Sequence, residues 1–388
     1  MEWKMKNYCL LALSLFAASL FADDDNAASN SKPSLFRATE SETSASSLLG
    51  EKEIKPLKPM RPPSFVFLDS PPYVFEIKYN SLILQPTANN LHYAAQANPL
   101  PAPTPNWIIH DIPTDYHYGF DLCLSGNIPS TCTNISVDWE HFHSTDSDST
   151  SLPSSDMIGP FFEIGPDASP YNKARGQVQF HFDQVNLDYG IFVHFGSRLR
   201  TNFFSGIGIA RIKETLKNEY SNPSGDIERT IETPSKFTGA GPRFGVNFSY
   251  QIVKGFQFGG GFAADFFMGT LENKTEYSSI SPALASVGVT PPNQQSTHTS
   301  NRMQLVPGFE GNLNLAYAWI FREHFVFKLV AGYEVQVYLN AIQSTDIGSE
   351  VNTPPVVPDT VGVYARTFQR ISSNFALSGP FVKVIFGF

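Results

Sequence analysis

The sequence is poor in cysteine, in charge and in long apolar runs. Its 388 residues include three cysteines, which excludes a small disulfide-rich scaffold. Beyond residue 22, no stretch reaches the roughly 18 uninterrupted apolar residues that a transmembrane helix requires. Lysine and arginine form no block and the net charge is -9, which argues against nucleic acid as a partner. Charged residues amount to 16% while phenylalanine occurs 33 times, so a chain that enters a membrane would do so as strands.

The first 72 residues divide into two parts. Lys4 and Lys6 precede an apolar run over 9–22, and three aspartates follow it. This order predicts a secretory signal peptide over 1–22, with a single N-terminal anchor helix as the alternative. Residues 23–72 are low in aromatics and rich first in Ser, Ala, Glu and Lys, then in Pro. Because that composition cannot bury a core, it predicts a flexible, disordered extension in the periplasm.

From residue 73 to residue 388 the hydrophobic pattern repeats every two residues. In 312–319 (NLNLAYAW), Leu313 and Leu315 share one face with Tyr317 and Trp319, and the residues between them share the other. Only a strand separates side chains in this way. Continued along the chain, the pattern predicts ten strands, at 73–86, 115–126, 132–143, 175–194, 199–219, 235–252, 255–272, 301–319, 324–342 and 366–388. These strands meet or exceed the roughly 9 to 11 residues that cross a bilayer.

The predicted connectors alternate between long and short. The connectors 144–174 and 343–365 are long and largely polar, whereas 195–198 and 253–254 are short turns. Long outside loops and short periplasmic turns are typical of outer-membrane barrels. The sequence therefore predicts an all-β fold over 73–388, a transmembrane up-and-down antiparallel β-barrel of about 10 strands (roughly 8 to 12). A large secreted β-sandwich is the alternative, although its strands should be shorter.

Charged residues lie on the strand faces opposite the aromatic ones, and these faces must share the barrel interior. By parity, the predicted lumen-lining residues are Glu76, Lys78, Asp121, Asp138, Glu140, Asp188, Arg243, Asp265, Glu310, Lys328, Glu334 and Lys383. Eight acids against four bases predict that any conductance prefers cations, as in a passive channel for ions or small hydrophilic solutes. The alternative is an interlocked polar plug, because about eight strands leave room only for side chains. The barrel would then be a structural surface protein, or an adhesin that binds a host surface ligand through its long loops.

Four segments carry a resemblance to a known family. They are FEIKYNSLILQ (75–85), VDWEHFH (137–143), GAGPRFG (239–245) and LVAGYEVQV (329–337). They are similar to the Legionella-type major outer membrane proteins, which also occur among chlamydia-related bacteria. The likeness spans roughly 73–388, and it implies a pore-forming barrel in the outer membrane of a bacterial cell.

Three further features of the sequence bear on a disulfide, a metal site or catalysis. Cys123 and Cys132 flank a turn-rich connector, which predicts a cross-turn disulfide in an oxidising compartment. His141 and His143 share one strand face, but two histidines without a third ligand do not predict a metal site. The segments 110–117 (HDIPTDYH) and 140–148 (EHFHSTDSD) lie at the same predicted rim, so these two clusters could meet. No sequence signal places a nucleophile beside a base, so we expect neither an enzyme nor a cofactor.

The last strand reads FVKVIFGF (381–388), in which Phe386 and Phe388 share a face and Lys383 lies with the lumen charges. A final strand with an aromatic last residue resembles the signal that the barrel assembly machinery recognises. We therefore expect Phe388 to act as an assembly signal. The strand should also pair with 73–86, because an open edge in outer-membrane lipid would leave backbone groups unsatisfied.

Overall fold

The computed structural model describes residues 74–98, 106–128, 132–153, 157–159, 171–280, 293–321, 325–352 and 362–388. The predicted signal peptide and extension, residues 1–72, lie outside this part of the chain. No helix among the described residues is long and apolar enough to cross a membrane. The strands are β1 (Phe75–Ala88), β2 (His92–Asn98), β3 (Asn106–Asp111), β4 (His117–Ile128), β5 (Thr133–Ser151), β6 (Met157–Gly159), β7 (Lys173–Phe195), β8 (Leu199–Ser221), β9 (Ile227–Val253), β10 (Phe256–Ser279), β11 (Asn293–His298), β12 (Arg302–Phe321), β13 (Phe325–Asn352) and β14 (Gly362–Gly387).

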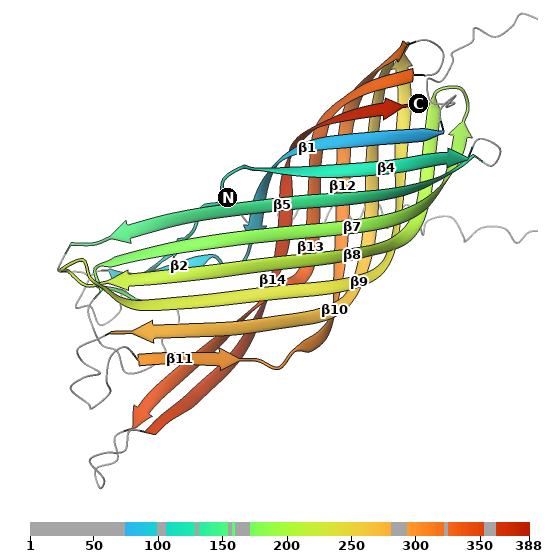
Figure 1. Ribbon diagram of the computed structural model, residues 1–388. Helices are drawn as coiled ribbons and strands as arrows, with labels where there is room; N and C mark the ends of the chain where they lie inside the picture. The colour runs from blue at the N-terminus through green and yellow to red at the C-terminus, as the bar shows by residue number, and fades with distance from the viewer. Residues whose placement is uncertain are drawn as a thin grey trace, which may run out of the picture. The chain divides into compact units, whose positions relative to one another are not determined.

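Ten of these strands form a closed antiparallel ring (Figure 1). Hydrogen-bonded neighbours follow the order β10, β12, β13, β14, β1, β4, β5, β7, β8 and β9, and β9 pairs with β10 to close the ring. Closure leaves no open edge, which is the condition for strands to span lipid. The predicted all-β barrel of about ten strands is therefore confirmed, and the predicted strands match the ring strands one for one.

The ring is sealed where its first and last strands meet. Glu76 of β1 lies opposite Gly387 of β14, and Leu82 lies opposite Phe381. The Phe388 N–H donates to the Phe75 carbonyl at 3.0 Å, and the two rings have centroids 6.4 Å apart. The predicted pairing of the last strand with the first is confirmed, whereas the role of Phe388 as an assembly signal stays a prediction.

The strands run further than predicted on the side of the long connectors. β5 continues to Ser151 and β13 to Asn352, so parts of the predicted loops 144–174 and 343–365 are strand. Side chains on both faces of 144–151 are mainly Ser, Thr and Asp, so this part of β5 shows no apolar period, although its backbone pairs with β7 throughout. The connection between β1 and β4 is not a plain loop either. Its strands β2 and β3 join β6 in a separate three-stranded sheet.

Large apolar side chains cover the outside of the ring near the short turns. Each ring strand contributes exposed members, among them Tyr79, Leu124, Val137, Leu187, Ile207, Phe244, Phe262, Leu313, Leu329 and Val382. A continuous exposed apolar surface of this kind is unfavourable in water and suits the hydrocarbon of a bilayer. This lipid-facing band marks the membrane-spanning part of the strands.

The interior changes character along the strands, as β7 shows. Gln184, Asn186 and Asp188 point inward beside the lipid-facing band and are buried. Phe180 and Phe182 lie on the same inward face, further from the short turns, and have no exposed surface. At the far end the small sheet packs into the barrel, where Tyr93 of β2 joins the buried apolar cluster of the ring strands. Polar and apolar layers therefore follow one another inside a single barrel.

Candidate functional site

Arg243 of β9 is the centre of the polar interior. Its Nη1 donates to both Asp265 carboxylate oxygens at 3.0 and 2.9 Å. Its Nη1 and Nη2 also donate to the two Glu310 oxygens at 2.7 and 2.5 Å, and its Nε lies 3.5 Å from Asp188. The Arg243 side chain is 8% exposed and that of Asp265 is 0% exposed. One guanidinium therefore holds three carboxylates from β7, β10 and β12, of which Asp188 and Asp265 are buried and Glu310 is partly buried. A guanidinium is the side chain best shaped for such bidentate contacts.

Amide side chains extend this network around the barrel. Gln184 Nε2 donates to Glu310 at 2.8 Å, and Asn186 Nδ2 donates to Asp138 at 2.8 Å. On the opposite wall, Gln336 Nε2 donates to both Glu140 oxygens at 2.8 and 2.9 Å. Neutral donors thus add a hydrogen bond to Glu310, and they supply hydrogen bonds to Asp138 and Glu140, for which no direct bond to Arg243 is found among the described contacts. These bonds lower the cost of burying the carboxylates.

Two polar cavities of about 200 and 250 Å³ occupy the interior beside the lipid-facing band. We refer to them together as the lumen chamber, because they share lining residues: Lys78, Asn134, Asn202, Asn247, Asn312 and Lys383. The second cavity lies toward the short turns, where Lys328 and Gly387 line it. Lys78 pairs with Glu76 at 3.0 Å and Lys383 with Asp121 at 3.7 Å. The chamber is large enough for several water molecules and is lined by both signs of charge.

Above the lumen chamber the interior is closed by packed rings. This aromatic layer consists of Phe142, Phe180, Phe182, Phe237, Phe267, Tyr338 and Phe375, each with 0% exposed surface. The Phe182 ring lies 5.3 Å from that of Tyr338 and 5.9 Å from that of Phe375. The Tyr338 hydroxyl donates to Gln184 at 2.6 Å, so this residue joins the rings to the polar network. The seven side chains of this layer are therefore packed out of contact with solvent.

Comparison with known proteins fits this architecture. The model of the family described as Legionella pneumophila major outer membrane protein precursor matches residues 71–388. The chain belongs to this family. It is therefore a β-barrel protein of the bacterial outer membrane, and the resemblance drawn from its sequence is confirmed.

Solved structures similar to this chain include three outer-membrane proteins. The first is the Escherichia coli outer membrane protease OmpT, which is 12% identical over 81% of this chain and 97% of its own, with a TM-score of 0.42. The second is the Pseudomonas putida toluene transporter TodX, which is 9% identical over 81% of this chain and 88% of its own, with a TM-score of 0.29. The third is the Pseudomonas aeruginosa outer membrane protein OprG, which is 10% identical over 82% of this chain and 96% of its own, with a TM-score of 0.21. No curated protein matches the chain.

The twelve residues predicted to line the lumen all point inward. The structure places all of them except Asp265 on the walls of the lumen chamber, and Asp265 lies directly against Arg243. It brings four of them, Asp188, Arg243, Asp265 and Glu310, into one cluster. Lys328 lines the chamber near the short turns, far along the strand from Glu334 and Gln336.

Sequence reasoning missed two parts of the interior. Arg200 of β8 lines the second cavity, with its guanidinium 3.7 Å from the centre of the Phe192 ring. The aromatic layer was also missed, because aromatic faces were expected to point to lipid. A usable signal was present, since Phe180 and Phe182 share the parity of Gln184 and Asp188.

The predicted disulfide between Cys123 and Cys132 is wrong. Both thiols are free, with Cys123 buried and Cys132 exposed. Cys123 lies opposite Asp138 in the ladder of β4 with β5, which is six residues along the chain from Cys132. At about 3.3 Å per residue the two cysteines are on the order of 20 Å apart along the strand, whereas a disulfide needs Cα atoms within about 7 Å.

The two histidine-containing segments at the rim do meet. His117 Nε2 lies 2.8 Å from Asp146, and His110 Nδ1 lies 3.4 Å from the Thr150 hydroxyl. Nearby, the Tyr93 hydroxyl contacts Asp148 at 3.0 Å and Thr150 at 2.7 Å. Burial of this hydroxyl in β2, outside the membrane-spanning part, raises the pKa of Tyr93 to about 12. These contacts fasten the small sheet to the inner wall of β5.

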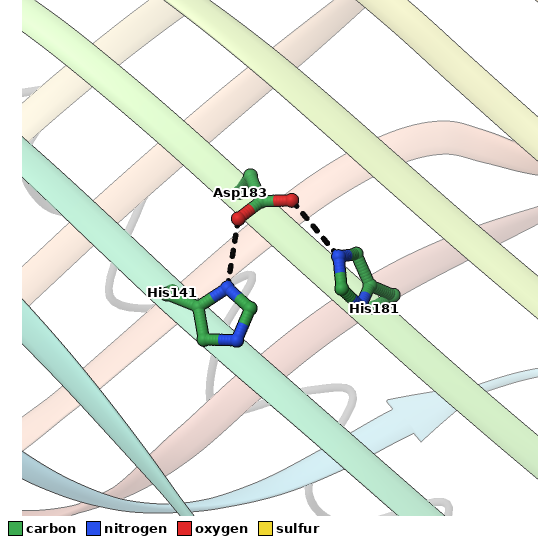
Figure 2. A group of neighbouring side chains, drawn as sticks. All are labelled: His141, His181 and Asp183. Carbon is green, nitrogen blue, oxygen red and sulfur yellow. Dashed lines mark hydrogen bonds and ion pairs between the residues drawn. The ribbon is translucent and has the colours of Figure 1, made fainter.

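A further cluster lies on the outer wall, beyond the lipid-facing band. His141 of β5 and His181 and Asp183 of β7 point toward one another, as Figure 2 shows. The third ligand that the sequence did not reveal is thus provided by a neighbouring strand. Pairing of β5 with β7 places Asp183 opposite His141, a relation that spacing along one strand cannot show.

Proposed function

We propose that the protein is a porin-like barrel whose acidic lumen chamber accepts cations and small polar solutes, and whose aromatic layer controls their passage. The observation that carries this proposal is the charged lumen chamber inside the membrane-spanning part of the ring. Its carboxylates outnumber its basic groups, with seven acids against five bases when Arg200 is included. Uncompensated carboxylates in a narrow lumen attract cations and repel anions. The proposal assigns no catalytic role to the chain.

The aromatic layer determines how open this passage is. Because its seven side chains have no exposed surface, we infer that the barrel is closed in the state described and conducts only when the rings move. Ring flips and local openings of packed side chains occur without unfolding, although rarely in a dense layer. Conductance should therefore be low and intermittent in the unmodified protein.

Planar-bilayer recording of the refolded barrel tests this function. The double variant Phe182→Ala and Phe375→Ala removes two facing rings, so we expect conductance at least several-fold above that of the unmodified protein, with cations favoured over anions. Leu187→Ala is the matched control, because Leu187 lies on the lipid-facing side of the same strand as Phe182 and is 51% exposed. Its conductance should equal that of the unmodified protein.

The second candidate is a sealed barrel that serves as a structural surface protein or adhesin. The complete burial of the aromatic layer favours it. The same recording separates the two functions. If neither the unmodified protein nor the double variant conducts, although both migrate as folded barrels on gels, the passage does not exist and the sealed barrel is the better account. The barrel assembly machinery is a predicted partner in either case, whereas a host surface ligand is predicted only for the adhesin.

A further inference from the structure

Four side chains form a square on the outer wall of the barrel, two from each of two paired strands. β5 contributes His141 and His143, and β7 contributes His181 and Asp183. The ladder pairs His141 with Asp183 and His143 with His181. All four have the parity of Trp139, which belongs to the exposed outer surface. The cluster therefore lies outside the lumen and is separate from the network around Arg243.

The donor atoms of three of these residues converge. Asp183 Oδ1 lies 2.8 Å from His141 Nδ1, and Asp183 Oδ2 lies 3.0 Å from His181 Nε2 (Figure 2). One donor atom from each of the three residues lies within 4.8 Å of the others. Ligand atoms bound to one Zn²⁺ at about 2.0 to 2.1 Å lie roughly 3.3 Å apart in a tetrahedral site. Small side-chain rotations would therefore bring the three donors onto a common ion.

His143 is placed to act as a fourth ligand. Its ring centroid lies 5.7 Å from that of His181, and the rings of His141 and His181 lie 5.3 Å apart. On the other side, the rings of Phe120 and Trp139 pack at 5.5 and 6.2 Å from that of His141. Aromatic packing of this kind limits the rotation of the His141 ring, so the ring loses less conformational entropy when an ion binds.

We propose that His141, His181 and Asp183, assisted by His143, bind a divalent transition-metal ion of the Zn²⁺ type on the outer wall of the barrel. Imidazole and carboxylate donors together suit Zn²⁺, Ni²⁺ or Cu²⁺, whereas Ca²⁺ and Mg²⁺ prefer oxygen donors alone. The barrel wall supplies ligands from one side, so the remaining coordination positions face outward. They lie just past Trp139, at the level where lipid headgroups begin.

Two basic side chains of β8 oppose the bound ion, Arg211 and also Lys213, which lies opposite His181 in the ladder. Arg211 of β8 lies opposite Asp183 in the ladder, and its positive charge disfavours a second cation nearby. The proposal therefore makes a directional prediction. Arg211→Gln should tighten metal binding, whereas removal of a ligand should weaken it.

Metal titration of the full chain, refolded in detergent without a histidine tag, tests the site. Isothermal titration with Zn²⁺ gives the affinity, and the visible absorption of bound Co²⁺ reports imidazole coordination. We expect His181→Ala to weaken binding at least tenfold, and Asp183→Asn, which keeps the side-chain shape, to weaken it in the same direction. Both variants should retain the heat-dependent gel mobility of a folded barrel.

His117→Gln is the matched control, because His117 pairs with one carboxylate, Asp146, at the same 2.8 Å as His141 with Asp183. Its affinity for Zn²⁺ should equal that of the unmodified protein. The proposal is overturned if the folded unmodified protein binds neither ion, in which case the cluster is a hydrogen-bonded triad only. It is also overturned if His181→Ala binds as tightly as the unmodified protein, or if His117→Gln weakens binding as much as His181→Ala.

Discussion

Replacing Arg243 by methionine should strongly destabilise the barrel. The change removes the four hydrogen bonds of 2.5 to 3.0 Å to Asp265 and Glu310 while keeping much of the side-chain volume. It leaves Asp265, which is 0% exposed, without a positive partner. Removing one member of a buried ion pair typically costs about 3–5 kcal/mol, because the remaining charge stays desolvated. We expect a loss of free energy of unfolding in that range.

A second substitution separates lost charge pairing from lost packing. Asp265→Asn in the Arg243→Met background removes the stranded carboxylate, so we expect it to restore part of the lost free energy, a coupling that only contacting residues show. Lys213→Met is the control for losing one positive charge, since Lys213 is exposed on the outer wall, and exposed substitutions typically change stability by less than about 0.5 kcal/mol.

Urea unfolding of the barrel in lipid vesicles, followed by tryptophan fluorescence and by gel mobility, measures these differences. The reasoning fails if Arg243→Met unfolds at the same urea concentration as the unmodified protein. It also fails if the double variant Arg243→Met, Asp265→Asn is less stable than Arg243→Met alone. Neutralising the unpaired Asp265 carboxylate would then not have restored any free energy of unfolding.

Three further outcomes follow from the packing. A maleimide should label Cys132 in the folded barrel and Cys123 only after unfolding, since Cys132 is exposed and Cys123 is buried; a cross-linked peptide in a non-reducing digest would contradict this. Gly308→Ala should lower the free energy of unfolding by about 1–3 kcal/mol, because the added Cβ would lie 2.9 Å from atoms of a buried ring. Gly311→Ala on the same strand is the control, since its Cβ would meet nothing within 4 Å, and it should leave the urea unfolding unchanged. Burial raises the pKa of Tyr93 to about 12, above its ordinary 10, so the contribution of its neutral hydroxyl to stability is present below pH 10 and is lost between pH 10 and 12. Alkaline unfolding that is unchanged in Tyr93→Phe would refute this prediction.

The barrel itself was predictable because lipid contacts one face of every spanning strand. Leu313 and Leu315 face lipid while Asn312 and Asn314 line the chamber. Apolar and polar residues therefore alternate along the sequence with a period of two residues. The inward-facing charged residues around Arg243 were predictable from the same alternation. Closure was predictable as well, since strands in lipid cannot leave an edge unpaired.

The aromatic layer could not be predicted from parity alone. Parity assigns Phe180, Phe182 and Gln184 to one face, but it does not say where along a strand the surroundings change from lipid to water. Beyond the bilayer the outer wall faces water, and the buried side becomes apolar as in a water-soluble protein. The expectation that rings face lipid therefore fails for that part of β7.

The cysteines and the outer histidine cluster required the register between strands. Ile128 and Thr133 form the last pair of the ladder between β4 and β5. Cys132 therefore lies in the turn beyond that ladder, whereas Cys123 lies within it. The pairing of His141 with Asp183 likewise depends on which strands are neighbours and on how they are aligned. Spacing within one strand contains neither quantity.

If the aromatic layer closes the barrel, as we propose, the lumen chamber communicates with one compartment. Short turns of such barrels face the periplasm, and the cavity lined by Lys328 and Gly387 lies at that end. Ions and protons held by the interior carboxylates would then exchange with the periplasm and not with the medium around the cell. We infer that the ions in the chamber follow the composition of the periplasm for as long as the aromatic layer stays closed.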